Sequence, residues 1–194
     1  MSVDRLLTAD ADTLDIDAIL AHFRAHGWAR LGPVLTATAA AAMRRRTDEL
    51  MLAAVQPAGL FFQHDSPTGD YADLEFGKGW RGPSPGYRKI ERLELDPLFR
   101  AWIENPVFER IARAAIPDAA IALYRAVLWT KAAGAPDRPG GMVLPWHQDG
   151  GRFWGVDRDP ELQIWTALDD APGEAGCVEV IPASHRAGLA TPEG

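Results

Sequence analysis

The amino-acid sequence predicts an α+β fold in which helices come first and a jelly-roll barrel follows. Residues 1–118 carry apolar side chains at helical spacing, whereas residues 119–194 carry short runs of β-branched and aromatic residues between Gly- and Pro-bearing loops. Helices followed by a run of antiparallel-looking strands are typical of a barrel buttressed by helices. We therefore expect a single domain over 1–194, with a helical part at 1–118 and barrel strands at 119–194.

Four helices are expected in the first part of the chain. Their boundaries are indicated by residue types that favour helix ends, with Thr36 and Asp96 as caps, Pro106 in a first turn and Gly27 after a last turn. The second helix is expected to turn its basic triplet, residues 44–46, toward solvent. The expected helices cover residues 17–26, 37–55, 97–104 and 106–116.

The segment 56–86 carries no periodic pattern and is rich in glycine, proline, aromatic and charged residues. A segment this long without regular structure is usually a lid or substrate loop, or else partly disordered. We expect no helix or strand in it. Strands are expected instead where β-forming residues alternate, at 28–31, 87–93, 121–131, 143–149, 162–168 and 177–181.

Composition excludes several classes of protein. The formal net charge of -7 argues against a nucleic-acid or anionic-membrane partner, because either would require a basic surface. One cysteine, Cys177, cannot form an internal disulfide. The sequence has no apolar run long enough for a signal peptide or a membrane span, so we expect a cytoplasmic protein.

The most informative motif is His147-Gln148-Asp149, which follows a Pro-Trp pair and precedes two glycines. In an extended segment, His147 and Asp149 would point to one face and Gln148 to the other. An imidazole and a carboxylate form a mixed donor set that suits Fe(II), Mn or Zn and leaves coordination positions open. A polar turn is the alternative interpretation, because this pattern arises by chance in roughly one such sequence in three.

Six motifs along nearly the whole chain occur in an order and spacing that extend this interpretation. They are F-R-A-H-G-W-A-R-L-G-P-V-L at 23–35, Y-R-K-I at 87–90, L-W-T-K at 128–131, P-W-H-Q-D at 145–149, W-T-A-L-D-D at 165–170 and G-C-V-E-V-I-P-A-S-H-R at 176–186. Together they resemble the phytanoyl-CoA dioxygenase family of Fe(II)- and 2-oxoglutarate-dependent oxygenases.

The resemblance implies a double-stranded β-helix that holds iron through two histidines and one carboxylate. His147 and Asp149 match the first two of these ligands. Lys89 matches a lysine that contacts 2-oxoglutarate, and Trp165 matches a tryptophan that lines the same pocket. Gln163, one pleat from Trp165, could also reach this pocket. From the residues alone, Lys89 would be a surface lysine, Trp165 a core residue and Gln163 a contact in the barrel wall.

The sequence also departs from the family pattern. In the family, the second histidine ligand lies on a strand well after the S-H-R turn, and so does an arginine that pairs with the far carboxylate of 2-oxoglutarate. We therefore expect these last barrel strands to be absent from the sequence that ends at Gly194. His185 belongs to the turn itself, which is not a ligand position. Trp146, Phe153 and Trp154 would form either a dry wall beside the iron or ordinary core.

The resemblance implies a dioxygenase that uses O₂ and 2-oxoglutarate to hydroxylate a small organic substrate. An inactive barrel that binds a metal or ligand, or serves as an assembly module, is the alternative, since two of the required groups are missing from the sequence. A cupin-like metal isomerase or hydrolase is a third possibility, and it would act without oxygen.

Overall fold

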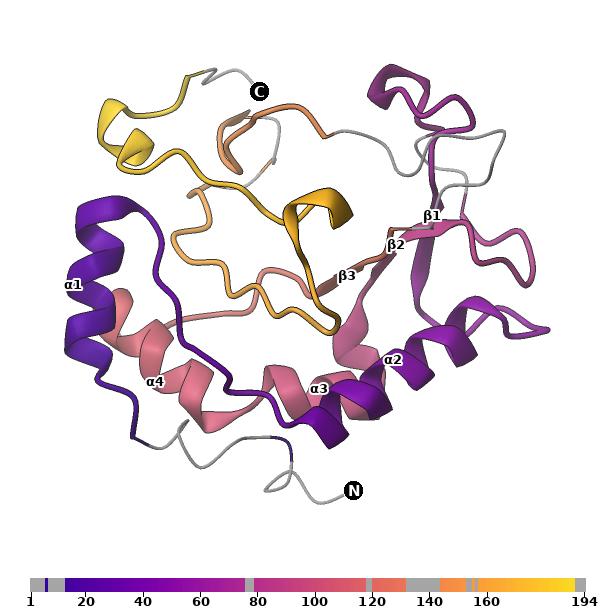
Figure 1. Cartoon of the computed structure of the whole chain (residues 1–194), viewed down its shortest axis with the longest axis horizontal. Coiled ribbons are helices and arrows are strands. Elements are labelled where there is room, and N and C mark those ends of the chain that lie inside the picture. Colours follow the sequence, from indigo (N-terminus) through magenta and orange to yellow (C-terminus); the bar gives the residue numbers. More distant parts are fainter. Residues whose placement is uncertain are drawn as a thin grey trace. The chain divides into compact units, whose positions relative to one another are not determined.

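The computed structural model describes residue 6 and residues 13–75, 79–117, 120–131, 144–152, 155 and 157–190 (Figure 1). The chain divides into two compact units. The first unit combines Met1–Ala41, Glu104–Ala122 and His147–Gly194, and the second combines Ala42–Ile103 and Leu123–Trp146. Both helices and a small sheet are present, as the α+β prediction requires.

Two packed helices, α1 (Ile16–His26) and α4 (Pro106–Ala115), support the first unit. The carboxylate of Asp15 accepts a hydrogen bond from the backbone N–H of Ala18, and Asn105 caps α4 in the same way. These caps satisfy N–H groups that lack partners within the helix. Apolar side chains on each helix are then buried in this unit: Leu20, Val107, Phe108 and Ile111. Both helices lie within one residue of their predicted positions.

The turn that contains His185 is docked onto the end of α1. The backbone N–H of Ala183 donates to the carbonyl of His26 over 2.8 Å, and Nε2 of His185 lies 3.1 Å from the carbonyl oxygen of Arg24. Gly27 makes this approach possible, because a Cβ atom at this position would lie 2.6 Å from Nδ1 of His185. The φ of Gly27, +82°, is also in the left-handed region that favours glycine.

We expect Gly27→Ala to lower the free energy of unfolding more than Gly32→Ala. Gly32 has a similar φ of +80°, but a Cβ there would meet nothing within 4 Å. Both substitutions introduce about 1–2 kcal/mol of backbone strain, whereas only the first creates a contact with His185. Urea unfolding of the two variants measures the difference, and His185→Ala in the Gly27→Ala background should recover it. Equal losses at both glycines would contradict the docking of this turn.

The second unit contains an antiparallel sheet in the order β1 (Phe61–His64), β2 (Tyr87–Glu91) and β3 (Val127–Trp129). In its register, Phe62 pairs with Ile90, and Ile90 pairs with Leu128. All three of these side chains are buried. The sheet therefore contributes a row of apolar side chains to the core of this unit.

An aromatic cluster covers one end of this sheet. Tyr87 stacks on Trp80 with ring centroids 5.3 Å apart, and Phe62 contacts both rings edge-on. The Tyr87 hydroxyl accepts from the backbone N–H of Arg81 and donates to the carbonyl of Gly82, each over 2.8 Å. The ring centroid of His64 lies 4.2 Å from that of Tyr87, and Nε2 of His64 is buried with no hydrogen-bond partner among the residues that the structure describes.

His64 is expected to make this unit less stable in mild acid. Burial lowers the pKa of His64 from its ordinary value, and the positive charge of Arg81 lowers that pKa further. As pH falls below about 6.5, His64 becomes protonated in the unfolded chain while it stays neutral in the folded chain. The free energy of unfolding therefore decreases as the pH is lowered. Urea unfolding at pH 7.5 and 5.5 should show a smaller acid loss for His64→Gln than for the unmodified chain. The exposed His22→Gln serves as control, and an unchanged acid loss in His64→Gln would contradict the prediction.

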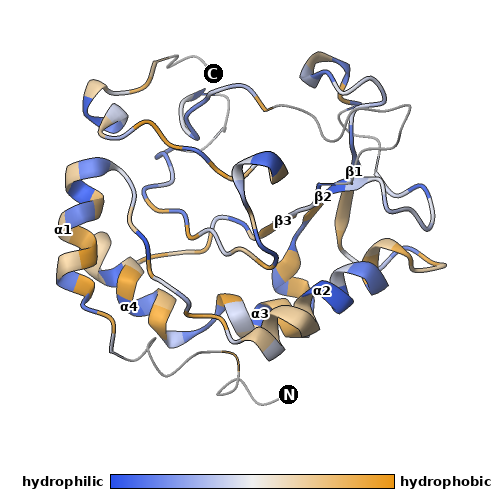
Figure 2. Cartoon of the chain, viewed as in Figure 1, coloured by the Kyte–Doolittle hydropathy of each residue, from blue (hydrophilic) through white to orange (hydrophobic). Residues whose placement is uncertain are grey.

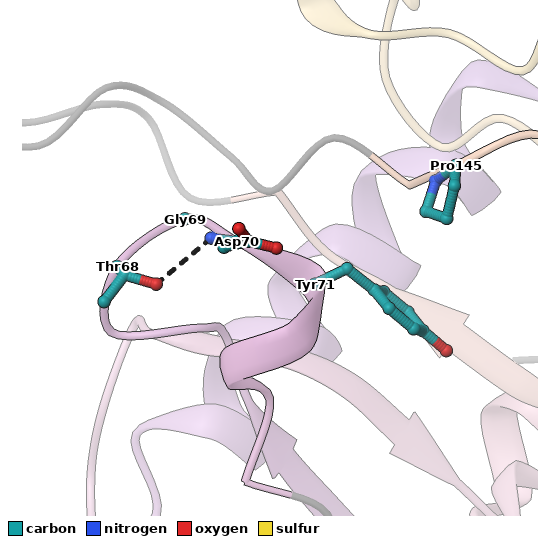
Figure 3. Close-up of a pocket in the computed structure, with 5 residues that line it drawn as sticks. All are labelled: Thr68, Gly69, Asp70, Tyr71 and Pro145. Carbon is teal, nitrogen blue, oxygen red and sulfur yellow. Dashed lines mark hydrogen bonds between the residues drawn. The ribbon is translucent and has the colours of Figure 1, made fainter.

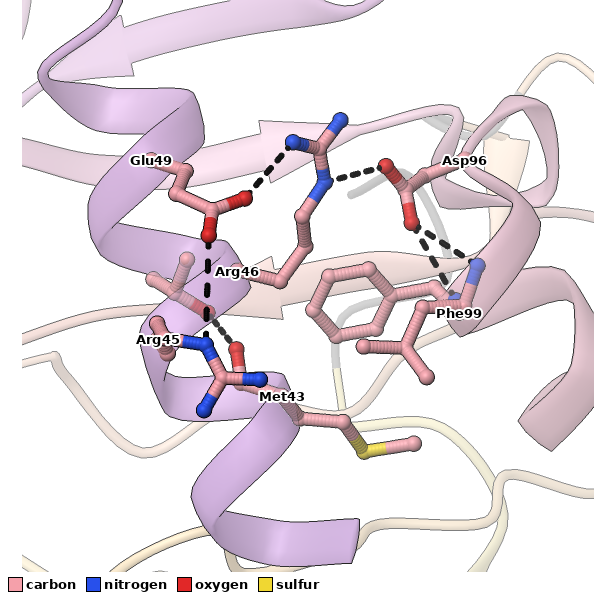
Figure 4. Close-up of polar contacts among 8 residues, drawn as sticks. Met43, Arg45, Arg46, Glu49, Asp96 and Phe99 are labelled. Carbon is pink, nitrogen blue, oxygen red and sulfur yellow. Dashed lines mark hydrogen bonds and ion pairs between the residues drawn. The ribbon is translucent and has the colours of Figure 1, made fainter. Parts of the chain in front are cut away.

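Two further helices, α2 (Ala37–Met51) and α3 (Pro97–Ile103), are joined by an ion pair (Figure 4). Oδ1 of Asp96 accepts hydrogen bonds from the first backbone N–H groups of α3, and Oδ2 accepts from Nε of Arg46 over 2.8 Å. Arg46 also bonds to Glu49, and the hydrogen bonds to Glu49 and then Asp96 raise the pKa of Arg46. The prediction that the basic triplet is merely a solvated surface is therefore wrong for Arg46.

The strand predictions agree with the structure only in part. The predicted strands at 87–93 and 121–131 contain β2 and β3, but β1 lies inside the segment for which no strand was expected. Of the described residues in 28–31, 144–149, 162–168 and 177–181, none forms a strand. Strand propensity alone does not make a ladder, which needs a neighbouring backbone to pair with. The jelly-roll barrel is thus not confirmed.

None of the helices within the described ranges is both long enough and apolar enough to span a membrane. Figure 2 accordingly shows polar as well as apolar residues on α1, α2 and α4.

Candidate functional site

A pair of donor atoms lies on the loop 147–151 of the first unit. Nε2 of His147 is 3.6 Å from Oδ1 of Asp149. Their side chains are 47% and 34% exposed, so both groups can be reached from solvent. The two residues therefore face the same way, as the spacing of the motif predicts, although the loop is not a strand.

Gln148, between these two residues, fixes the backbone of the loop. Its Nε2 donates to the carbonyl of Gly188 over 3.1 Å, and its Oε1 accepts from the N–H of Ala190 over 2.7 Å. One side chain thus satisfies a carbonyl and an amide of a facing segment, as a paired strand would. These two hydrogen bonds explain why Gln148 points away from His147 and Asp149 although the loop is not part of a sheet.

Two other segments also hold the loop. Nε2 of Gln163 donates to Oδ2 of Asp149 over 2.6 Å. Oδ1 of Asp159 accepts from the backbone N–H of Gly151 over 2.7 Å. Gly150 is buried against Leu189 and Asp159, because a Cβ atom there would lie 3.0 Å from a methyl group of Leu189 and 3.3 Å from the Asp159 carboxylate. The loop is therefore anchored in three ways. The Gln148 side chain bonds to the backbone of residues 188 and 190, Asp159 bonds to the loop backbone at Gly151, and Gln163 bonds to the Asp149 carboxylate.

The geometry of the His147–Asp149 pair fits a divalent metal ion. Two donor atoms that each lie about 2.1 Å from one ion can be at most about 4.2 Å apart, so a separation of 3.6 Å is compatible with a shared ion. A nitrogen and a carboxylate oxygen are also the donors that Fe(II) prefers. Within the part of the chain that the structure describes, no cluster of three His, Cys, Asp or Glu side chains completes the site.

Trp165 forms part of the wall of a pocket in the same unit, with a volume of about 390 Å³. Its side chain is 57% exposed, which is not the position of a core residue. Arg30 brings a positive charge to this pocket, and Asp169 and Asp170 bring negative charges. Gln163 comes two residues before Trp165 in the chain, so the segment that lines the pocket also contacts Asp149.

Lys89 lies on β2 in the second unit and is largely buried. Its side chain is 14% exposed, its ammonium forms an ion pair with Glu91, and Nζ lies 5.1 Å from the centre of the Trp129 ring. A lysine with these contacts is not an ordinary solvated surface residue.

The segment between β1 and β2 lines an open pocket of about 500 Å³ in the second unit (Figure 3). A turn from Thr68 to Tyr71 forms one side of it, and Pro145 lies on the other. The backbone N–H of Asp70 donates to the hydroxyl of Thr68 over 3.2 Å, which holds the turn closed. Trp146, which was expected to form a dry wall or core, is 64% exposed; Phe153 and Trp154 lie outside the described residues.

A family model described as Phytanoyl-CoA dioxygenase (PhyH) matches residues 23–192. The chain belongs to the phytanoyl-CoA dioxygenase family. The resemblance carried by the six motifs is thereby confirmed. Members of this family are typically dioxygenases, and they generally depend on Fe(II) and 2-oxoglutarate. Comparisons with curated proteins and with solved structures found no match.

The structure brings some of the residues predicted for this family together. His147, Asp149 and Gln163 form one cluster in the first unit, and Trp165 lines a pocket of the same unit. Lys89 belongs to the second unit and was found there beside Glu91. Sequence reasoning did not place Arg30 beside Trp165, because the two residues belong to motifs far apart in the chain and their proximity arises from tertiary folding.

Proposed function

We propose that this member of the phytanoyl-CoA dioxygenase family is an Fe(II)- and 2-oxoglutarate-dependent dioxygenase that hydroxylates a small organic substrate with O₂. The observation that carries the proposal is the 3.6 Å separation of the His147 and Asp149 donor atoms on an anchored loop. The family match over residues 23–192 supports the reaction class. The corresponding fold is the family's jelly-roll, a double-stranded β-helix, with helices at its side.

In this proposal His147 and Asp149 hold the iron, with Nε2 and Oδ1 as donors. When bound, iron and 2-oxoglutarate supply the oxidising chemistry that replaces a C–H bond by a C–OH bond. The chain supplies two ligands from one side, which leaves other coordination positions open. A short, anchored loop is suited to this task because metal sites require donors that are already in place.

We assign Lys89, Trp165 and Gln163 to the binding of 2-oxoglutarate. The ammonium of Lys89 could pair with a carboxylate of this cosubstrate, in exchange for its present partner Glu91. The exposed ring of Trp165 offers an apolar wall for the carbon chain. Arg30, in the same pocket as Trp165, offers a planar guanidinium that suits a carboxylate.

The proposal is tested by incubating the purified chain with Fe(II), ascorbate and 2-oxoglutarate in air and following succinate. We expect succinate formation that requires Fe(II) and oxygen and is lost in His147→Ala, while the exposed His22→Ala retains it. Formation that survives in His147→Ala would contradict the site. Turnover of a substrate without oxygen would favour a cupin-like isomerase or hydrolase.

A non-catalytic metal- or ligand-binding module, which could also act in assembly, is the second candidate. It is favoured by the presence of two, not three, clustered ligand side chains among the described residues. The non-catalytic module predicts that the chain binds metal without forming succinate, whereas the dioxygenase predicts both metal binding and succinate formation.

We also propose that the protein works in the cytoplasm and has no nucleic-acid or membrane partner. The net charge of -7 supports the second part of this proposal, because nucleic acids and anionic membranes repel such a protein. Mixing the chain with DNA or with anionic vesicles at low salt should show no binding.

A further inference from the structure

The two carboxylate oxygens of Asp149 have different surroundings. Oδ1 faces Nε2 of His147 at 3.6 Å, whereas Oδ2 accepts the 2.6 Å hydrogen bond from Gln163. We propose that Gln163 is a positioning residue that holds Asp149 so that Oδ1 is the oxygen offered to a divalent metal shared with His147. This inference rests on the proposed function, because it assigns a role within the same metal site.

The orientation of Asp149 needs a partner of this kind. An aspartate carboxylate rotates easily, because its terminal torsion has broad and roughly two-fold preferences. The Asp149 side chain is one-third exposed, so packing alone leaves it free to turn. A hydrogen bond to one oxygen stops this rotation and leaves the lone pairs of the other oxygen available.

Glutamine is well suited to this position. Its amide nitrogen donates a hydrogen bond to the carboxylate without bringing a charge. A lysine at position 163 would neutralise Asp149 and compete with a cation, and a glutamate would repel it. The same bond uses one of the two N–H groups of the Gln163 amide, and the second N–H is left for a contact with 2-oxoglutarate.

Gln163 differs from the other residues that hold the loop. Gln148 and Asp159 bond to backbone groups, so they determine the path of the loop. Gln163 bonds to a side chain, so its removal should leave the path of the loop intact and change the orientation of Asp149. The two roles therefore predict different results in stability and in metal affinity.

The experiment compares Mn(II) binding to the unmodified chain, Gln163→Leu and Gln56→Leu by electron paramagnetic resonance titration. Gln56 donates one hydrogen bond to the carbonyl of Leu60 in the second unit, so Gln56→Leu makes the same chemical change away from the site. We expect Gln163→Leu to raise the Kd for Mn(II) about 10- to 100-fold, and Gln56→Leu to leave it unchanged. The thermal midpoint of metal-free Gln163→Leu should stay near that of the unmodified chain, whereas Gln148→Leu should lower it.

A second measurement separates positioning from a general loss of function. In the succinate assay, Gln163→Leu should raise the Fe(II) concentration needed for half-maximal rate by a larger factor than the 2-oxoglutarate concentration needed for half-maximal rate. An unchanged Kd in Gln163→Leu would overturn this inference and leave the proposed function intact. A thermal midpoint lowered as much as in Gln148→Leu would also overturn it, in favour of a structural role. Failure of the unmodified chain to bind Mn(II) would overturn the metal site and the proposed function together.

Discussion

Asp149→Asn is expected to weaken metal binding strongly with little change in the fold. Asparagine has nearly the same shape and can still accept the hydrogen bond from Gln163 through its carbonyl oxygen. It lacks the negative charge that a divalent ion requires from a carboxylate ligand. Loss of a residue that supports a ligand typically costs 10–100-fold in metal affinity, so loss of the charged ligand itself should cost about 100-fold or more. Mn(II) titration measures this effect, and succinate formation should fall below detection.

Asp157→Asn is the matched control for this prediction. Asp157 is an exposed aspartate shortly after the same loop, and the identical substitution there removes one negative charge without touching His147. It should leave the Kd for Mn(II) within a few-fold of the unmodified value. Similar losses in both variants would mean that metal binding depends on general negative charge, and Asp149 would no longer be a ligand.

The orientation of the donor pair could be predicted from sequence, but not the means by which it is achieved. Alternation in an extended segment places His147 and Asp149 together, and this holds whether or not the segment pairs with another strand. The structure obtains the same result through the side-chain bonds of Gln148 to residues 40 and 42 positions later. Such bonds connect distant segments, so no local pattern in the sequence signals them.

The helices were predictable because their signals are local. Each begins at a capping residue and carries apolar side chains at a spacing that is visible within a few turns, as α1 and α4 show. The short strand β1 was missed because four residues are too few to display a period amid glycine and proline. Its pairing with β2 is determined by the buried contact of Phe62 with Ile90, which lies 28 positions away. The strands expected after residue 143 show the opposite error, since β-forming residues occur there without a paired ladder among the described residues.

The ion pair between Arg46 and Asp96 is expected to contribute more to stability than the ion pair that the same arginine forms with Glu49. The Asp96 side chain is 2% exposed and satisfies three donors: Nε of Arg46 and the backbone N–H groups of Leu98 and Phe99. Asp96→Ala removes the cap of α3, which is worth about 1 kcal/mol, and leaves the guanidinium without its buried partner. Because Arg46 is itself partly exposed, we expect a total loss of roughly 2–4 kcal/mol in the free energy of unfolding, measured by urea denaturation.

Glu49→Ala tests the other partner of the same arginine and serves as the control. Glu49 is 52% exposed, and an exposed ion pair is worth about 0–1 kcal/mol, although its bond to Arg46 is nearly as short as that of Asp96. The stability loss in Asp96→Ala should therefore exceed that in Glu49→Ala severalfold. Asp96→Asn should fall between them, because the amide oxygen can still cap α3 while the charge is lost. Equal losses in Asp96→Ala and Glu49→Ala would show that burial of the carboxylate does not determine the strength of this contact.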